Sequence, residues 1–263
     1  MDKKNSFVLR HLSELRPDLW WLDSDPLEPE ARSSLIGDVG TDLCVVGAGY
    51  TGLWTALLAK ERDPQRSVVV VEQYETGAGA SGRNGGFCSA SLTHGFGNGM
   101  RRFADEMPLI EAMGRENLDE IEDTILRYGI ECDFERTGEL RVAVEPWQLD
   151  DMLEEARLRN EMGDHVEVLS REEVRARIHS PVYEGAIFDP DGTALVDPAR
   201  LVWGLERACL SLGVTIYENS KVLNLEDVDG AVRVHTPYGA VTATRVALAT
   251  SSQSPRSFRS CSA

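Results

Sequence analysis

Three glycines at a fixed spacing point most directly to a chemical role. They belong to a G-x-G-x-x-G run, Gly47-Ala48-Gly49-Tyr50-Thr51-Gly52. Gly47 allows a tight turn, Gly49 lets the backbone approach a pyrophosphate without a Cβ in the way, and Gly52 lets a helix pack close to a sheet. Free N–H groups at the start of that helix, from Tyr50 and Thr51 onward, then hold phosphate oxygens. The run predicts a dinucleotide site if a strand precedes it and a helix follows it.

An acidic residue follows these glycines at the distance that a dinucleotide-binding unit requires. Glu72 ends a second apolar run about 20 residues after Gly52. A carboxylate at this place accepts hydrogen bonds from ribose hydroxyls, and its charge argues against a 2′-phosphate and therefore against NADP. The alternative is a plain glycine turn with a solvent-facing Glu72. The order of strand, glycines, helix, strand and acid favours the dinucleotide site.

Apolar runs and helix formers predict the elements that hold these residues. Residues 42–46 form a short apolar run with β-branched side chains, residues 50–62 are rich in helix formers, and Pro64 ends that segment. Residues 67–72 are a continuous apolar run of the kind that is buried on both faces of a parallel sheet. Strand, turn, helix and strand together predict a βαβ unit.

Periodicity predicts further elements along the chain. Leu118, Ile121 and Ile125 recur at spacings of three and four, which indicates the core face of a helix. Ser170 with Glu173 three residues on is the capping-box pattern of a helix start. More helices are expected over 147–161, 171–178 and 200–212, a strand over 139–144, and a β-meander over 221–225, 232–236 and 241–248.

A second glycine-rich stretch, residues 77–86, follows Glu72 closely. An NAD-binding domain does not need such a stretch at this place. A flavin-binding domain needs one, because backbone must lie close to the ribityl chain and the tricyclic ring of the flavin. Ser81 and Asn84 can hydrogen-bond to phosphate or to the ring edge. The pair of glycine-rich stretches therefore favours FAD over NAD.

The two glycine stretches also carry a family resemblance. GYTGLWTA at 49–56 followed by GASGRNGG at 79–86 resembles the D-amino-acid-oxidase-like FAD-dependent oxidoreductases, and among them the γ-glutamylputrescine-oxidase-like branch. The likeness covers roughly residues 35–250. It implies an α/β fold with a Rossmann-like FAD-binding domain of the glutathione-reductase type, including the β-meander. That domain would take residues 1–93 and 195–250, with a partial substrate domain inserted at 94–194.

The resemblance also implies which residues bind FAD. Gly47, Gly49 and Gly52 would bind its ADP half together with Glu72. The residues near the pyrophosphate and flavin would be Ala80, Ser81, Asn84, Gly85 and Gly86. The backbone of Val222, in the first meander strand, would meet the adenine, although a plain buried strand valine is the alternative.

The family's chemistry transfers a hydride from a carbon next to an amine nitrogen to the flavin, giving an imine that water hydrolyses. The cofactor performs the difficult step, so no side-chain nucleophile and no catalytic residue are predicted. His94 either lies near the flavin or is a structural hydrogen-bonding residue. The resemblance implies a small amine or amino acid as substrate, with a γ-glutamylputrescine-like molecule as the specific candidate. An NAD-dependent dehydrogenase and a non-catalytic truncated dinucleotide-binding fragment remain as alternatives.

The resemblance is expected to stop at Thr250, although members of the family run well past this length. Residues 251–263 contain six serines and show neither helical nor strand periodicity. We therefore expect an unstructured or non-native tail on a C-terminally truncated family member.

The composition excludes several classes of protein. The chain has 263 residues, with 27 Lys and Arg against 44 Asp and Glu, and a net charge of −17. That charge repels nucleic acid and anionic lipid, and neither a secretory signal nor a membrane-spanning stretch is found. The five cysteines are scattered and lack a C-x-x-C pair, so neither a disulfide framework nor a zinc site is expected. We expect a cytoplasmic protein without nucleic-acid, membrane or metal partners.

Overall fold

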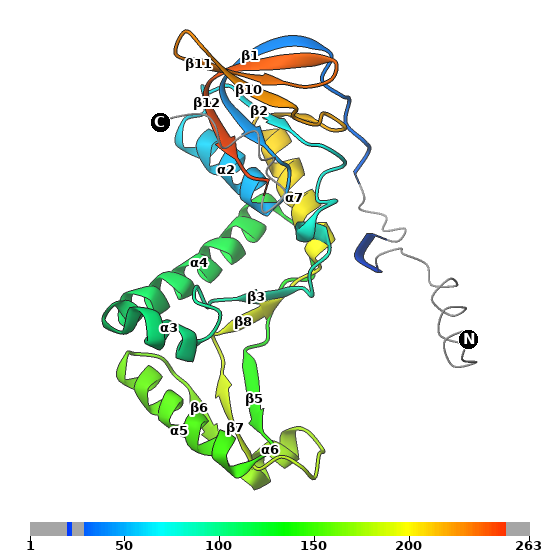
Figure 1. The fold of residues 1–263 in the computed structure, drawn as a ribbon. Coiled ribbons are helices and arrows are strands. Elements are labelled where there is room, and N and C mark those ends of the chain that lie inside the picture. The colour runs from blue at the N-terminus through cyan, green and yellow to red at the C-terminus, as the bar shows by residue number, and fades with distance from the viewer. Residues whose placement is uncertain (1–19, 23–28, 251–263) are drawn as a thin grey trace, which may run out of the picture. The chain divides into compact units, whose positions relative to one another are not determined.

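The computed structural model describes residues 20–22 and 29–250, which divide into two units (Figure 1). Unit 1 contains the described residues up to Arg83 and from Leu205 onward, and unit 2 is Asn84–Gly204. The FAD-binding and substrate domain bounds implied by the resemblance stay a prediction. The tail expected at 251–263 lies outside the described residues.

A six-stranded sheet forms the centre of unit 1. Its strands, in spatial order, are β10 (Asn224–Val228), β11 (Ala231–His235), β12 (Gly239–Leu248), β1 (Gly37–Val46), β2 (Val68–Val71) and β9 (Thr215–Tyr217). β12, β1, β2 and β9 run parallel to one another, and β10, β11 and β12 form an antiparallel meander. This mixed sheet with helices confirms the predicted α/β class.

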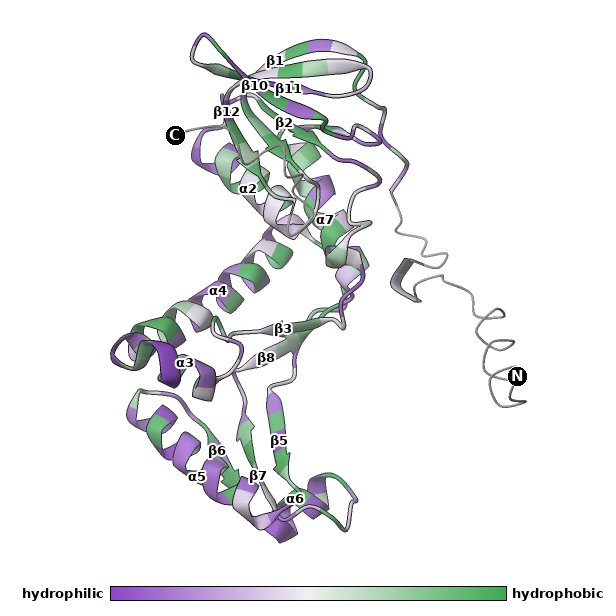
Figure 2. Ribbon diagram, viewed as in Figure 1, coloured by the Kyte–Doolittle hydropathy of each residue, from purple (hydrophilic) through white to green (hydrophobic). Residues whose placement is uncertain are grey.

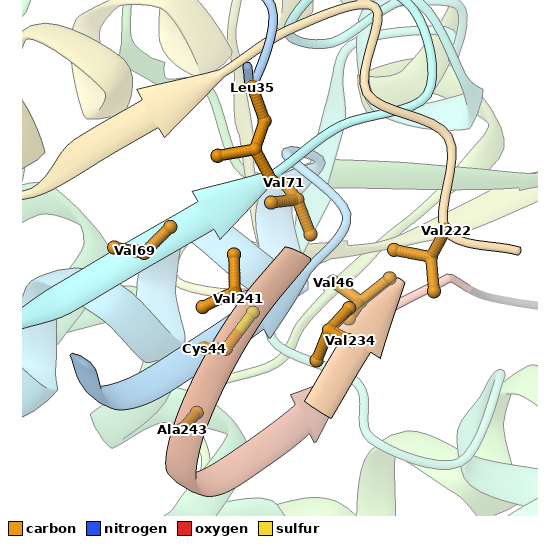
Figure 3. Packing of buried hydrophobic residues seen from close by; sticks show 9 residues of the cluster. All are labelled: Leu35, Cys44, Val46, Val69, Val71, Val222, Val234, Val241 and Ala243. Carbon is orange, nitrogen blue, oxygen red and sulfur yellow. The ribbon is translucent and has the colours of Figure 1, made fainter. Parts of the chain in front are cut away.

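The core of unit 1 lies on both faces of this sheet. All four valines of β2 are buried, as expected for a central parallel strand. Figure 3 shows the cluster on one face, where Cys44, Val46, Val69 and Val71 pack with the meander valines Val234 and Val241 and with Leu35, Val222 and Ala243. Full burial of each such side chain stabilises the fold by roughly 1.5–3 kcal/mol.

One helix, α2 (Tyr50–Arg62), connects β1 to β2. It has the bounds that the sequence predicts, because the glycine run precedes it and Pro64 follows closely. Val45 faces α2, since its Cγ1 lies 3.3 Å from the place of a Cβ added to Gly52. Val70 is the register partner of Val45, so it lies on the same face of the sheet. The helix therefore covers the face opposite the cluster of Figure 3.

Unit 2 contains two three-stranded antiparallel sheets and four helices of its own. Their bounds are β3 (Phe87–Ser89), β4 (Glu135–Arg136), β5 (Glu139–Ala143), β6 (Glu167–Leu169), β7 (Gly185–Asp189), β8 (Thr193–Leu195), α3 (Phe96–Phe103), α4 (Met107–Tyr128), α5 (Pro146–Glu161) and α6 (Arg171–Arg177). The sheet orders are β3-β8-β4 and β5-β7-β6. A further helix, α7 (Pro198–Ser211), contains the boundary to unit 1. Figure 2 shows α5 as mostly hydrophilic, whereas the central strands of unit 1 are mostly hydrophobic.

Several predicted elements differ from the structure in their bounds. β1 begins at Gly37, and the first meander strand begins at Asn224 rather than at Lys221. The second glycine-rich stretch, residues 77–86, contains the 3-10 helix η2 (Ala80–Gly82), and β3 follows it directly. The capping box before α6 is confirmed, because the Ser170 and Glu173 side chains each accept a hydrogen bond from the other's backbone N–H. No helix in the described part of the chain is long and apolar enough to span a bilayer.

Candidate dinucleotide site

Gly47 and Gly52 are required by the packing of unit 1. Gly47 has a φ of 108°, which favours glycine, and a Cβ on it would lie 2.7 Å from the carbonyl oxygen of Ala249. A Cβ on Gly52 would lie 1.9 Å from the carbonyl oxygen of Gly47. The N–H of Gly47 donates to the carbonyl oxygen of Val71 at 2.8 Å. These contacts let α2 start directly beside the ends of β1, β2 and β12.

Gly49 differs, because the fold does not require a glycine there. Its φ of −88° is open to any residue. Among the described residues, the atoms within 4 Å of an added Cβ are Oγ and Cβ of Ser81, at 2.8 and 3.8 Å. Gly49 precedes α2 and gives it no side-chain cap. Gly49 therefore keeps bare backbone beside the hydroxyl of Ser81 at the positive end of a helix, an arrangement that suits an anionic ligand.

Glu72 contacts the first glycine turn with its carboxylate. Oε2 accepts a hydrogen bond of 2.7 Å from the N–H of Ala48, and Oε1 accepts one of 3.0 Å from the N–H of Tyr74. The side chain is therefore not the free, solvent-facing carboxylate of the alternative interpretation. Each carboxylate oxygen has about two lone pairs, so Glu72 keeps acceptor capacity for hydroxyl groups of a ligand.

The second glycine-rich stretch returns to the first within unit 1. The N–H of Gly77 donates to the carbonyl oxygen of Ala48 at 3.1 Å. Ser81, in η2, accepts a hydrogen bond of 2.9 Å at Oγ from the N–H of Tyr50, the first residue of α2. Ala80 and Thr51 are exposed close to these residues in the sequence. Glu72, Ser81 and the first glycine turn thus gather around one helix start and the end of β2.

The other predicted residues of this stretch belong to unit 2. The N–H of Gly86 donates to Oδ1 of Asn84 at 2.9 Å, and the carbonyl oxygen of Gly86 accepts from the N–H of Val196 at 2.9 Å. Gly86 has a φ of 77°, and a Cβ on it would lie 2.4 Å from the carbonyl oxygen of Val196. A Cβ on Gly85 would lie 3.3 Å from the ring of Phe87. Gly86 therefore has a structural reason to be glycine, and flavin contacts of these residues stay a prediction.

The sequence predicts that Val222 lies in the first meander strand, and this prediction is wrong. Val222 precedes β10 by two residues, because the ladder with β11 starts at Asn224. Its side chain is buried in the core cluster shown in Figure 3. The side chain therefore acts as a core valine, and the contact of its backbone with adenine stays a prediction.

His94 lies in unit 2, where it lines a cavity of about 550 Å³. The other lining residues are mostly polar or charged and include Glu111, Arg115, Arg159 and Asp189. Burial raises the pKa of the Glu111 carboxyl, and the nearby Arg159 acts against this effect. Arg159 is itself paired with Asp189 at 2.5 Å, so much of the charge in this wall is already neutralised.

Sequence reasoning missed two buried carboxylates in unit 1. Glu206 in α7 is fully buried, and Glu218, directly after β9, is 3% exposed. Both contact Arg32. The available signal was a single acid within an apolar stretch, as in Leu205-Glu206 of α7. A charge at such a place must be paired when the helix is packed on a sheet.

A parallel sheet, a G-x-G-x-x-G turn at a helix start and an acid at the end of the next strand define the Rossmann type of dinucleotide-binding fold. Comparison with known families gives the particular class. The family model described as "DAO: FAD dependent oxidoreductase" matches residues 42–261, which continues past Thr250, where the resemblance was expected to stop. The chain belongs to this family of FAD-dependent oxidoreductases.

Individual relatives agree with this assignment. The chain is 35% identical over 210 residues to the gamma-glutamylputrescine oxidoreductase of Escherichia coli, covering 79% of this chain and 48% of the relative. It is 32% identical over 216 residues to the probable oxidoreductase OrdL of Haemophilus influenzae, covering 80% and 48%. The crystal structure of glycine oxidase from Geobacillus kaustophilus has the same fold, with a TM-score of 0.67, 22% identity, and coverage of 80% of this chain and 55% of that one. The chain spans about half the length of the curated relatives it matches.

Proposed function

We propose that this protein binds FAD through unit 1 and serves the oxidation of a C–N bond in a small amine or amino acid. The observation that carries the proposal is the bare backbone of Gly49 at the start of α2, where an added Cβ would lie 2.8 Å from the Oγ of Ser81 and no backbone atom is in the way. FAD, when bound, accepts a hydride from the carbon next to the amine nitrogen.

Different residues of unit 1 would bind different parts of the cofactor. The backbone at Gly49 and the N–H groups of α2 after Tyr50, whose own N–H donates to Ser81, would hold the pyrophosphate, because they combine close approach with the positive end of the helix dipole. Ser81 would bring a hydroxyl to the same place. Glu72 would accept hydrogen bonds from the adenosine ribose with the acceptor capacity that Ala48 and Tyr74 leave.

A γ-glutamylputrescine-like amine is the specific substrate that we propose. Support comes from the 35% identity to the gamma-glutamylputrescine oxidoreductase over most of this chain. The protein's part in the reaction would be to hold the amine with its C–H bond aimed at the cofactor and to exclude competing water, which is positioning rather than covalent catalysis.

The test is a titration of the purified protein with FAD, and separately with NAD, followed by visible absorbance and tryptophan fluorescence. We expect tight uptake of FAD and weak or no uptake of NAD. The loaded protein is then mixed anaerobically with γ-glutamylputrescine, glycine or sarcosine, and bleaching of the flavin absorbance reports the reaction. A protein that takes up no FAD would contradict the cofactor proposal. FAD uptake without bleaching by any amine would favour a dinucleotide-binding protein without turnover.

A further inference from the structure

Two buried carboxylates in unit 1 have no part in the site described above. Glu218 directly follows β9 and Glu206 lies in α7. Arg32 contacts both, because its backbone N–H donates to Oε2 of Glu218 at 2.7 Å and its Nε donates to Oε1 of Glu206 at 2.8 Å. A buried carboxylate is tolerated only when charges and hydrogen bonds compensate it. The two acids share one arginine and differ in what else they contact.

Glu218 holds the residue that begins the second glycine-rich stretch. Its Oε1 accepts a hydrogen bond of 2.7 Å from the N–H of Thr76. The hydroxyl of Thr76 is buried and has no hydrogen-bond partner among the described residues. The polar link that fixes Thr76 to Glu218 therefore runs through the backbone. Three backbone hydrogen bonds of 2.7–2.9 Å between segments 72–74 and 217–220 bring Glu218 to this place.

Gly77, the residue after Thr76, connects this segment to the first glycine turn. The N–H of Gly77 donates to the carbonyl oxygen of Ala48 at 3.1 Å, and the N–H of Ala48 donates to Oε2 of Glu72 at 2.7 Å. Three hydrogen bonds of 2.7–3.1 Å, joined by the backbone of Thr76, Gly77 and Ala48, thus connect Glu218 to Glu72.

We propose that Glu218 is a positioning residue for the dinucleotide site. Its carboxylate fixes the second glycine-rich stretch against the first turn, and the backbone N–H of Arg32 donates the other hydrogen bond to it. This inference rests on the proposed FAD binding, although Glu218 itself touches no part of the ligand in the proposal. Loss of the carboxylate should loosen the stretch 76–82 and so weaken FAD binding before it unfolds the protein.

The experiment compares Glu218→Gln with Glu206→Gln. Both substitutions remove one negative charge beside Arg32. Each carboxylate oxygen of Glu218 accepts from an N–H donor, so an amide NH₂ at this place must face a donor. Oε2 of Glu206 has no partner among the described residues, so an amide at that place can keep its oxygen on the Nε of Arg32. Amide hydrogen exchange of Thr76 and Gly77 is measured by NMR on the FAD-free protein, and the Kd for FAD is measured by fluorescence. We expect Glu218→Gln to speed the exchange of Thr76 and to raise the Kd by about tenfold or more, as for loss of a hydrogen bond to a charged group. Glu206→Gln should leave both within about twofold.

Two outcomes would overturn the inference. One is unchanged exchange at Thr76 in Glu218→Gln. The other is an equal effect of Glu206→Gln, which would mean that charge balance around Arg32 matters and the link to Thr76 does not. If Glu218→Gln does not fold, Glu218→Asp tests the same link, because it keeps the charge but shortens the reach and should give a smaller change in the same direction. A wild-type protein that binds no FAD would contradict the proposed function, while the exchange comparison still tests the role of Glu218.

Discussion

The glycines of the first turn differ in what the fold demands of them. At Gly47 and Gly52 an added Cβ would meet backbone carbonyl oxygens, at 2.7 and 1.9 Å respectively. At Gly49 it would meet the hydroxyl oxygen of Ser81 at 2.8 Å, a side-chain atom that accepts a hydrogen bond from the N–H of Tyr50. A single sequence pattern therefore contains two positions where an added Cβ meets backbone and one where it meets a side-chain hydroxyl.

This difference predicts losses of stability that differ in size. Gly52→Ala should lower the free energy of unfolding by about 1–3 kcal/mol or more, because α2 must move away from the turn to relieve the contact. Gly49→Ala should lower it by less than about 1 kcal/mol, the usual range for a helix N-cap. Urea unfolding of both variants, followed by circular dichroism, checks the pair. Equal losses in the two variants would contradict the distinction.

At the scale of elements, the sequence predicts those whose signals are local. α2 has its predicted bounds because a glycine turn and a proline flank it. β2 is predicted from its run of four valines. β9 was missed because three residues are too few to show a period, and β7 because Gly185–Asp189 resembles a turn as much as a strand. The start of the meander was placed too early because Val222 and Leu223 read as strand residues before the ladder begins.

In the candidate dinucleotide site, too, the sequence predicts only what local patterns indicate. The glycine turn, Glu72 and the second stretch lie within 40 residues and follow known spacings, so the sequence predicts them together. Arg32 contacts Glu206 and Glu218 across separations of 174 and 186 residues. No local pattern links residues so far apart. Their meeting depends on the place of β9 at the edge of the sheet of unit 1 and on the packing of α7.

α7 carries a pH-dependent contribution to stability through Glu206. Burial raises the pKa of this carboxyl above its ordinary 4.5 and Glu218 adds to the rise, whereas Arg32 and Arg207 oppose it. The native state therefore binds the proton more tightly than the unfolded state, so stability falls as pH rises from 4.5 through the raised native pKa. Compared with Glu206→Gln, the wild-type protein should lose free energy of unfolding over that window and then level off. Urea unfolding in steps between about pH 4.5 and 8 measures the difference, and a constant difference would refute the assignment.

At the scale of the whole molecule, charge opposes the ligand while the local site attracts it. The chain has a net charge of −17, and FAD carries two phosphate charges. Long-range repulsion is screened by salt more strongly than contacts at hydrogen-bond distance, since the screening length is about 10 Å at 0.1 M ionic strength. Binding should therefore respond to salt in the direction opposite to that of a basic nucleotide-binding protein.

This contrast gives a kinetic prediction. The association rate constant for FAD should rise as the salt concentration increases from about 10 to 100 mM, because repulsion slows the encounter more than it weakens the bound state. Stopped-flow fluorescence of the FAD-free protein measures the rate. An association rate that falls over this range would show that local positive groups dominate the encounter.

The most direct test of the proposed cofactor site compares Gly49→Val with Gly40→Val. Gly40 lies in β1 with open space around it, so its substitution controls for the change of glycine to valine in the same unit. We predict that Gly49→Val folds but binds FAD at least about tenfold more weakly, a loss of about 1.4 kcal/mol or more, because the side chain fills the space over the start of α2. Gly40→Val should bind FAD like the wild-type protein. A folded Gly49→Val protein that takes up FAD with wild-type affinity would contradict the site.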